Sequence, residues 1–210
     1  MIVTDIIQHN KTKYKIYVDS EFAFVLYKGE LHKYHIQKGE VISEQVYHEL
    51  TAQVLPKRAK LRAMNLLTKR PYTEKKLREK LEEGLHSKEC TDIAIDYVKS
   101  FGYLDDKSYA QDYIAYHMAD VSVKVLEQKL IQKGIDVHII RECLEEIGTA
   151  ECADAEQKQI SQLLWKKFHG QIPQEMTEKT KMMNFFLRKG YSMSSVNRVL
   201  TDFSLDDLYN

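Results

Sequence analysis

Three short segments of this chain resemble one another, and each of them ends in a glycine. They read LREKLEEG (77–84), LEQKLIQKG (126–134) and MMNFFLRKG (182–190). Their apolar residues recur at helical spacing, and glycine readily takes the left-handed conformation that commonly follows the last turn of a helix. Each segment therefore predicts a helix that ends at its glycine.

Further helices are predicted on both sides of each segment. Longer ones are expected before the segments, over 56–69, 105–118 and about 151–169. Amphipathic ones are expected after the segments, because apolar residues again recur there at helical spacing. These residues are Ile93, Tyr97 and Val98; Ile139, Ile140, Leu144 and Ile147; and Val196, Val199, Leu200 and Phe203.

The predicted fold class is mainly α, since 8 glycines and 3 prolines are few for a loop-rich β protein. One three-helix unit buries little surface, whereas stacked units share cores at their junctions. We therefore expect three tandem three-helix units that form an elongated, curved molecule. Their expected bounds are 56–104, 105–148 and 149–210, after an amino-terminal β extension with a covering helix over 1–55.

The amino-terminal extension has the periodicity of strands. Apolar or aromatic residues alternate with other residues over 14–18 and again over 22–26. Strands over 2–8 and 31–36 would complete a small antiparallel sheet. An isolated hairpin is only marginally stable, so at least three strands or a packed helix are needed, and we expect a helix that begins near Ser43. Its apolar stripe consists of Val46, Leu50 and Val54.

Several classes of protein are excluded by composition. The three cysteines, Cys90, Cys143 and Cys152, are isolated, which predicts reduced thiols and no disulfide scaffold. No apolar run approaches the ~20 residues of a membrane span, and no signal peptide opens the chain. We expect a cytoplasmic protein with no membrane contact.

No catalytic constellation is present in the sequence. The 8 histidines are scattered without an HExxH motif, and neither a phosphate loop nor GxGxxG occurs. The pair Asp105-Asp106 could hold a magnesium ion, but no third carboxylate follows at a useful spacing, so a helix cap is favoured. We therefore expect no catalytic residue, no metal and no cofactor, and hence no enzyme.

The charge is zero overall but is distributed unevenly. Residues 56–104 carry 12 Lys/Arg against 7 Asp/Glu, which leaves +5, and residues 105–148 carry 5 against 9, which leaves −4. This polarity suggests an oriented partner. The residues that we assign to contact with a partner or DNA are Lys57, Arg58, Arg62, Lys69, Arg70, Lys76, Arg78, Lys166, Lys167, Arg188, Lys189 and Arg198. A solubilising face or contact with an acidic protein surface would give the same charge pattern.

Aromatic residues are interpreted mainly as packing residues. Tyr109, Tyr113 and Tyr116 could form a base-stacking platform, but their helical spacing favours a packed face. Trp165 and Phe168 are assigned to the core because of their spacing with Leu164.

One stretch, GYLDDKSYAQDYI (102–114), predicts a loop followed by the start of a helix. Asp105 can cap the helix, and Asp106 adds negative charge at the positive end of the helix dipole. Tyr109, Ala110 and Tyr113 follow on one face, together with Ile114. This stretch resembles the hallmark sequence of the RecX family, and the stretches 70–81 and 126–135 resemble two others. The three stretches occur in the family's order over roughly 56–148. A weaker similarity extends as far as Phe203.

The resemblance implies a regulator of the RecA recombinase that acts in DNA repair by homologous recombination. It implies a curved helical monomer that lies in the groove of the RecA–DNA filament and inhibits its ATPase, its growth and strand exchange, with DNA reached through the filament. The loop 120–124 departs from the family pattern because it lacks the usual glycine. Two other functions stay open: a helical protein that binds DNA without RecA, and a helical-repeat adaptor for another protein.

Overall fold

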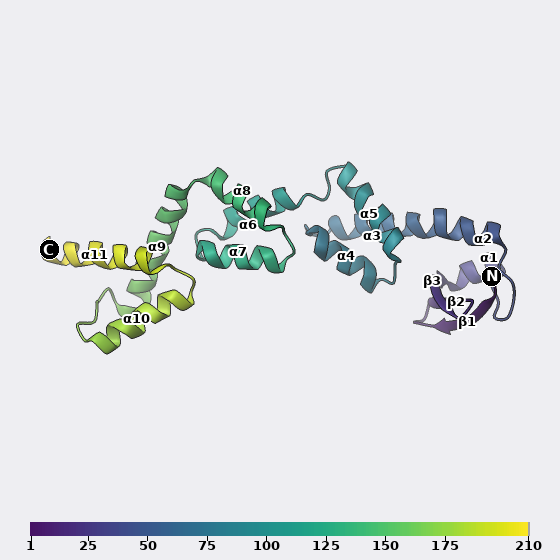
Figure 1. Cartoon of the computed structure of the whole chain (residues 1–210), viewed down its shortest axis with the longest axis horizontal. Helices are drawn as coiled ribbons and strands as arrows, with labels where there is room; N and C mark the ends of the chain where they lie inside the picture. Colours follow the sequence, from purple (N-terminus) through teal and green to yellow (C-terminus); the bar gives the residue numbers. More distant parts are fainter. Residues whose placement is uncertain (210) are drawn as a thin grey trace. The chain divides into compact units, whose positions relative to one another are not determined.

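The structure is a computed structural model that describes residues 1–209, with side chains as far as Phe203. The chain divides into two compact halves, 1–105 and 106–210 (Figure 1).

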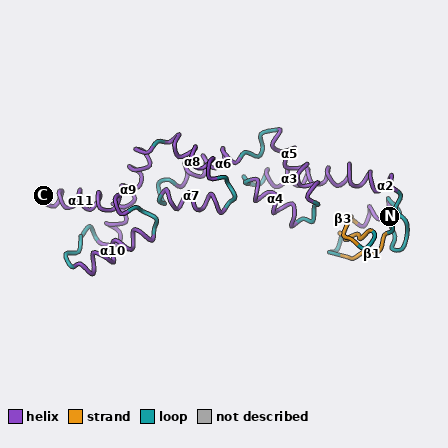
Figure 2. Tube along the Cα trace, viewed as in Figure 1, coloured by secondary structure: helices purple, strands orange, loops and turns teal. Residues whose placement is uncertain are grey.

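The amino-terminal half begins with a three-stranded antiparallel sheet (Figure 2). Its strands are β1 (Val3–Gln8), β2 (Lys13–Val18) and β3 (Glu21–Tyr27), in that order across the sheet. Asp19 and Ser20 connect β2 to β3 with φ values of 48° and 73°. Two consecutive residues with positive φ form the tight turn whose twist suits a hairpin. The predicted small antiparallel sheet is confirmed.

The predicted strand over 31–36 is wrong, because the chain forms a short helix there, α1 (Lys28–Lys33). The Tyr27 N–H donates to the carboxylate of Glu30 at 2.7 Å, which satisfies a free donor at the helix start. The segment between this helix and Ser43 contacts the sheet. The Val3 N–H donates to the carbonyl of Glu40 at 2.9 Å, so residues beyond α1 line the outer edge of β1.

The covering helix begins where the sequence predicts. Ser43 caps α2 (Glu44–Glu49), because its Oγ accepts from the Val46 N–H at 3.2 Å. A π-helical turn, η1 (Leu50–Val54), joins α2 to α3 (Leu55–Leu67) without a loop. Pro56 at the start of α3 explains the wide turn, since proline lacks an N–H and its ring crowds the carbonyl four residues earlier.

Helices α4 (Glu74–Glu83) and α5 (Lys88–Ser100) complete the first three-helix unit with α3. Leu77 and Leu81 of α4 are fully buried, and they belong to the same core cluster as Ile16 and Leu26 of the sheet. The sheet and the first unit therefore share one core.

The carboxy-terminal half contains the other two units. The second consists of α6 (Asp106–His117), α7 (Val123–Gln132) and α8 (Val137–Ile147). The third consists of α9 (Thr149–Phe168), α10 (Met176–Arg188) and α11 (Met193–Tyr209). Each has its own core, and the prediction of a mainly α fold made of three-helix units is confirmed.

The same backbone hydrogen bond closes the helix of each glycine-ending segment. The residue that takes the left-handed conformation there is not a glycine in all three. The N–H groups of His86, Ile135 and Tyr191 donate to the carbonyls of Leu81, Leu130 and Phe186, five residues earlier. The residue before each donor is left-handed: Gly134 (φ 92°) and Gly190 (φ 91°), but Leu85 (φ 63°) in the first unit. The prediction that Gly84 takes this conformation is wrong, because it lies one position too early, with φ −76°.

Candidate partner-binding surfaces

Arg58 holds the sheet onto α3. Its Nη1 donates to the carbonyl of Val25 at 2.8 Å, and its Nη2 pairs with the carboxylate of Glu30. The guanidinium also lies 4.7 Å from the centre of the Tyr27 ring. With its side chain 18% exposed, Arg58 is engaged within its own half of the chain.

Arg78 joins α4 to α5. Its Nε donates to Glu74 at 2.7 Å, and its Nη1 pairs with Asp92 of α5. Burial raises the pKa of Glu74, but hydrogen bonds from Lys99 and Arg78 outweigh it, so the pKa of that carboxyl is lowered overall. Lys76 likewise pairs with a carboxylate, that of Glu79, at 2.7 Å.

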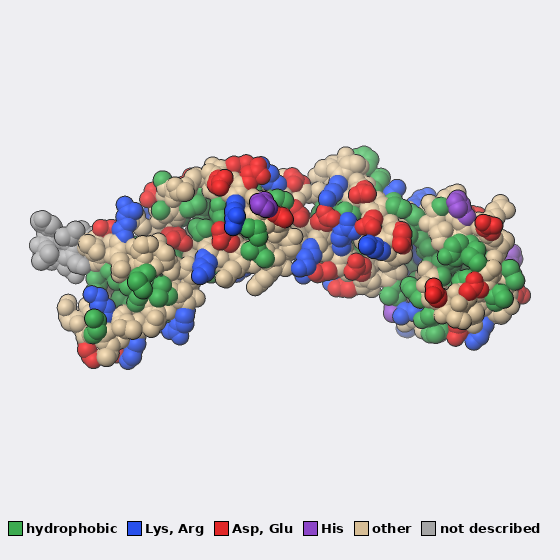
Figure 3. Space-filling model, in the orientation of Figure 1, with side chains coloured by type: hydrophobic (Ala, Val, Ile, Leu, Met, Phe, Trp, Pro, Cys, Tyr) green, Lys and Arg blue, Asp and Glu red, His purple; other side chains and the backbone are tan. Residues whose placement is uncertain are grey.

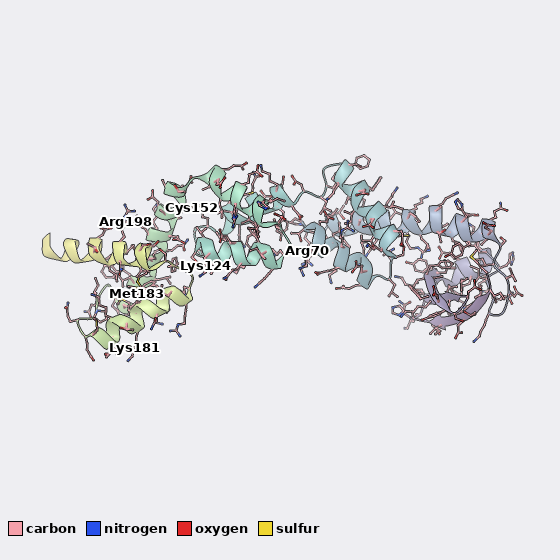
Figure 4. The ribbon with its side chains drawn as sticks, viewed as in Figure 1. Arg70, Lys124, Cys152, Lys181, Met183 and Arg198 are labelled. Atoms are coloured by element: carbon pink, nitrogen blue, oxygen red, sulfur yellow. The ribbon has the colours of Figure 1, made fainter. Side chains whose placement is uncertain are left out.

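The remaining predicted contact residues of the first unit lack a carboxylate partner in the described part of the chain. Lys57, Arg62 and Lys69 are exposed, and Arg70 lies 4.7 Å from the ring centre of Tyr72. Arg70 belongs to the loop between α3 and α4 (Figure 4). Over α4 and α5, basic and acidic side chains are interleaved (Figure 3). The free positive charge of this unit is therefore concentrated on α3 and the loop after it.

In the third unit, basic residues gather where two helices end. Lys166 and Lys167 lie in the last turn of α9, Arg188 lies in the last turn of α10, and Lys189 is the C-cap of α10. All four are exposed, and none has an ion pair with a described residue. Their positive charges also complement the negative ends of the two helix dipoles.

Two of these lysines converge on one aromatic ring. The Nζ of Lys167 lies 3.8 Å from the ring centre of Phe185, and the Nζ of Lys189 lies 5.3 Å from it. Phe168 contacts the same ring edge-on at 5.7 Å. We call Lys167, Phe168, Phe185 and Lys189 the Phe185 cluster. Arg198, on α11, has no ring contact with these residues within the described structure.

A buried polar junction connects the second and third units, and the sequence did not reveal it. Gln159 of α9, only 4% exposed, donates through Nε2 to the carbonyls of Met118 (2.6 Å) and Val121 (3.2 Å). Its Oε1 accepts from the Tyr191 hydroxyl at 2.7 Å. Burial and then the charge of Glu156 raise the pKa of Tyr191 to about 12, so the hydroxyl remains a donor over the physiological range.

The loop before α7 completes this junction. The Ser122 Oγ donates to the carbonyl of Lys189 at 2.9 Å instead of capping its own helix. Glu156 of α9 takes over that role, because its Oε1 accepts from the Val123 N–H at 3.0 Å. The only sequence signal for this arrangement was the departure of residues 120–124 from the expected glycine-containing turn.

Two aromatic predictions are wrong. Trp165 is 61% exposed, because Ile160 and Leu164 define the buried stripe of α9 and residue 165 lies off it. Tyr116 is 79% exposed for the corresponding reason on α6. Phe168, by contrast, packs against the core of the third unit.

The tyrosines of the hallmark stretch pack within the second unit. Tyr109 and Tyr113 are half-buried with nearly parallel rings, whose centres are 6.3 Å apart, and the Lys133 Nζ lies 5.6 and 5.1 Å from those centres. Ala110 between them is fully buried. Asp106 is the first residue of α6, and Asp105 precedes it.

The described residues contain neither a metal site nor a membrane-spanning helix. Those residues contain no group of three or more His, Cys, Asp or Glu side chains placed to hold a metal ion. None of the described helices has the length and the apolar character that crossing a bilayer requires.

Comparison with known proteins gave matches along most of the chain. Family models described as the first and the third three-helix domain of RecX match residues 59–98 and 154–200. The chain is 27% identical to "Regulatory protein RecX" of Caldanaerobacter subterraneus subsp. tengcongensis, over 95% of this chain and 98% of the other. It is 26% identical to the protein of the same name in Clostridioides difficile, over 100% and 99%.

Solved structures show the same fold. A "Crystal structure of regulatory protein RecX" superposes with a TM-score of 0.63, at 24% identity, over 96% of this chain and 98% of that one. A structure of RecX from Lactobacillus salivarius gives a TM-score of 0.62, at 21% identity, over 72% of this chain and 98% of that one.

Proposed function

The chain is a member of the RecX family of regulatory proteins, and from this premise we propose that it regulates the RecA recombinase by binding in the groove of the RecA–DNA filament. By occupying the groove it inhibits ATP hydrolysis, filament growth and strand exchange. It does so by binding alone, without a catalytic residue of its own.

The observation that carries the proposal is the presence of exposed positive charge without an ion pair among the described residues in two of the repeated units. Arg62, Lys69 and Arg70 provide such charge in the first unit, and Lys166 and Arg188 provide it in the third. A partner built from protein and DNA presents negative charge at regular intervals, which suits a chain with basic residues in more than one of its repeated units.

The test is an assay of the ATPase of RecA on single-stranded DNA with this protein added below the RecA concentration. Strong suppression at substoichiometric amounts indicates action on filament growth, and a requirement for equimolar protein indicates coating of the groove. Full ATPase activity at every ratio would refute the proposal.

The contribution of the first unit can be tested by charge reversal. The double variant Arg62→Glu/Arg70→Glu should need several-fold more protein for half-maximal inhibition, because both side chains are free for an intermolecular contact. The matched control is Lys11→Glu/Lys88→Glu, which makes the same charge change at exposed positions of the same half. Equal loss in both variants would assign the effect to net charge alone.

A further inference from the structure

The Phe185 cluster has the geometry of a prepared anion site. Lys167 comes from α9 and Lys189 from the end of α10, yet both ammonium groups lie within 5.3 Å of the centre of one ring. The ring itself is half-buried and is held edge-on by Phe168 and Phe186, at 5.7 and 5.2 Å. Two like charges thus lie beside one ring at the surface.

The polar junction fixes the backbone that carries these lysines. The carbonyl of Lys189 accepts from the Ser122 Oγ at 2.9 Å. Gly190 follows with a left-handed φ of 91°, and a Cβ at this position would lie 2.5 Å from the Ser122 Oγ. Lys167 lies on the same helix as Gln159, which is buried in the junction. The backbone that carries both lysines is therefore already ordered before a partner binds, so binding has only their side chains left to order.

Neither lysine has a carboxylate partner among the described residues. Lys181 of α10, which is labelled in Figure 4, differs from these two lysines, because its Nζ pairs with the carboxylate of Glu178 at 2.7 Å. Helix-dipole compensation explains basic residues at each helix end, but it does not require side chains from two helices to converge on a ring. The convergence points to an external anion between or beside the two ammonium groups.

The residue types favour phosphate over carboxylate. Lysine is depleted in protein–protein interfaces and binds phosphate as a point charge, whereas paired carboxylates are better matched by the planar fork of arginine. A phenylalanine beside the lysines adds an aromatic ring that a base can contact, as in proteins that bind single strands without sequence preference.

We propose that the Phe185 cluster is a contact site for single-stranded nucleic acid. Lys167 and Lys189 neutralise neighbouring backbone phosphates, and the ring of Phe185 contacts one base. The proposal rests on the proposed function only for the source of the strand, which is the DNA of the filament. The contact itself needs no RecA.

The test measures binding of a fluorescein-labelled oligothymidylate to the full chain by anisotropy, without RecA, over a range of salt concentrations. Each phosphate contact on a single strand contributes about −0.7 to the slope of log K against log salt. Lys167→Gln/Lys189→Gln should therefore reduce the slope by about 1.4 and weaken binding roughly sixtyfold at 0.05 M salt and roughly tenfold at 0.2 M.

The matched control is Lys158→Gln/Lys179→Gln, which removes the same charge from the same two helices. Lys158 lies nine residues before Lys167, and at about 100° per residue this places it on the opposite face of α9. The control should bind within twofold of the unaltered protein. A separate variant, Phe185→Leu, keeps an apolar side chain and should lose about tenfold in affinity without a change in slope.

The proposal is overturned if the Lys167/Lys189 variant keeps the slope of the unaltered protein, or if the control loses as much. It is also overturned if polyglutamate displaces the strand at equal charge concentration and Phe185→Leu has no effect, since an acidic protein surface would then be the partner. Circular dichroism verifies that each variant is folded. ATPase inhibition measured with the same variants separates this proposal from the proposed function, because strand binding can persist where RecA is unaffected.

Discussion

The buried side chain of Gln159 predicts a large and specific cost when its hydrogen bonds are removed. It makes three, two as a donor to the carbonyls of Met118 and Val121 and one as an acceptor from the Tyr191 hydroxyl, between 2.6 and 3.2 Å. The informative substitution is Gln159→Leu, because leucine is close to glutamine in volume and so removes the polar groups without opening a large cavity.

The magnitude follows from the groups left behind. Each buried donor or acceptor that loses its partner costs about 1–3 kcal/mol, and the Leu variant leaves three such groups. Burial of an apolar side chain returns about 1.5–3 kcal/mol, so the net decrease in the free energy of unfolding should be about 3 kcal/mol. Tyr191→Phe orphans only the Gln159 Oε1 and should cost about 1.5 kcal/mol.

The two substitutions should not be additive. In the Leu variant the Tyr191 hydroxyl has already lost its acceptor, so its removal should cost less than in the unaltered protein. The coupling expected in a double-mutant cycle is about 1 kcal/mol or more. Urea unfolding can be monitored by the fluorescence of Trp165, which is the single tryptophan and lies on the same helix as Gln159.

At a urea m-value of about 2 kcal/mol/M, a loss of 3 kcal/mol lowers the transition midpoint by about 1.5 M. Far-UV circular dichroism tests whether the second unit unfolds with the third. If Gln159→Leu shifted the midpoint by less than a quarter of that amount, or if Tyr191→Phe cost the same in both backgrounds, the assigned hydrogen bonds would not stabilise the junction.

Three further outcomes follow from the same structure. Arg58→Met leaves a partly buried carboxylate unpaired and should destabilise the amino-terminal half by about 3 kcal/mol in urea unfolding. Gly190→Ala should cost about 1–3 kcal/mol more than Gly39→Ala in thermal unfolding, since both have positive φ but only the first places a Cβ against Ser122. Burial and a nearby carboxylate raise the pKa of Tyr191 from 10.0 to about 12. The free energy of unfolding of the unaltered protein should therefore decrease as the pH rises from 10 to 12. Unfolding measured as a function of pH should show no such decrease for Tyr191→Phe.

Helices were predictable where the signal lies within a few residues. Leu81, Leu130 and Phe186 are each the last buried residue of their segment, and each accepts the same hydrogen bond from the residue five positions later. All three segments share this apolar spacing, and it marks the last turn of each helix. The glycine is a weaker signal, because Leu85 takes the left-handed conformation that Gly134 takes in the second unit.

The strand predicted over 31–36 failed because a specific local hydrogen bond starts a helix there. Glu30 accepts from the Tyr27 N–H and so starts a helix, and Arg58 fixes the same carboxylate from 28 residues further along the chain. The first contact is within reach of sequence reasoning. The second is not, because it depends on where α3 packs against the sheet.

The same limitation decides which charges a partner can use. Arg70 and Arg78 are equivalent in a count of charge along the chain, and the sequence predicts both as contact residues. In the folded protein Arg78 bridges Glu74 and Asp92, whereas Arg70 contacts only an aromatic ring among the described residues. Reversal of Arg78 should therefore reduce stability first, and reversal of Arg70 should reduce binding first. A charge count identifies the basic region, but only tertiary pairing determines which of its residues can bind a partner.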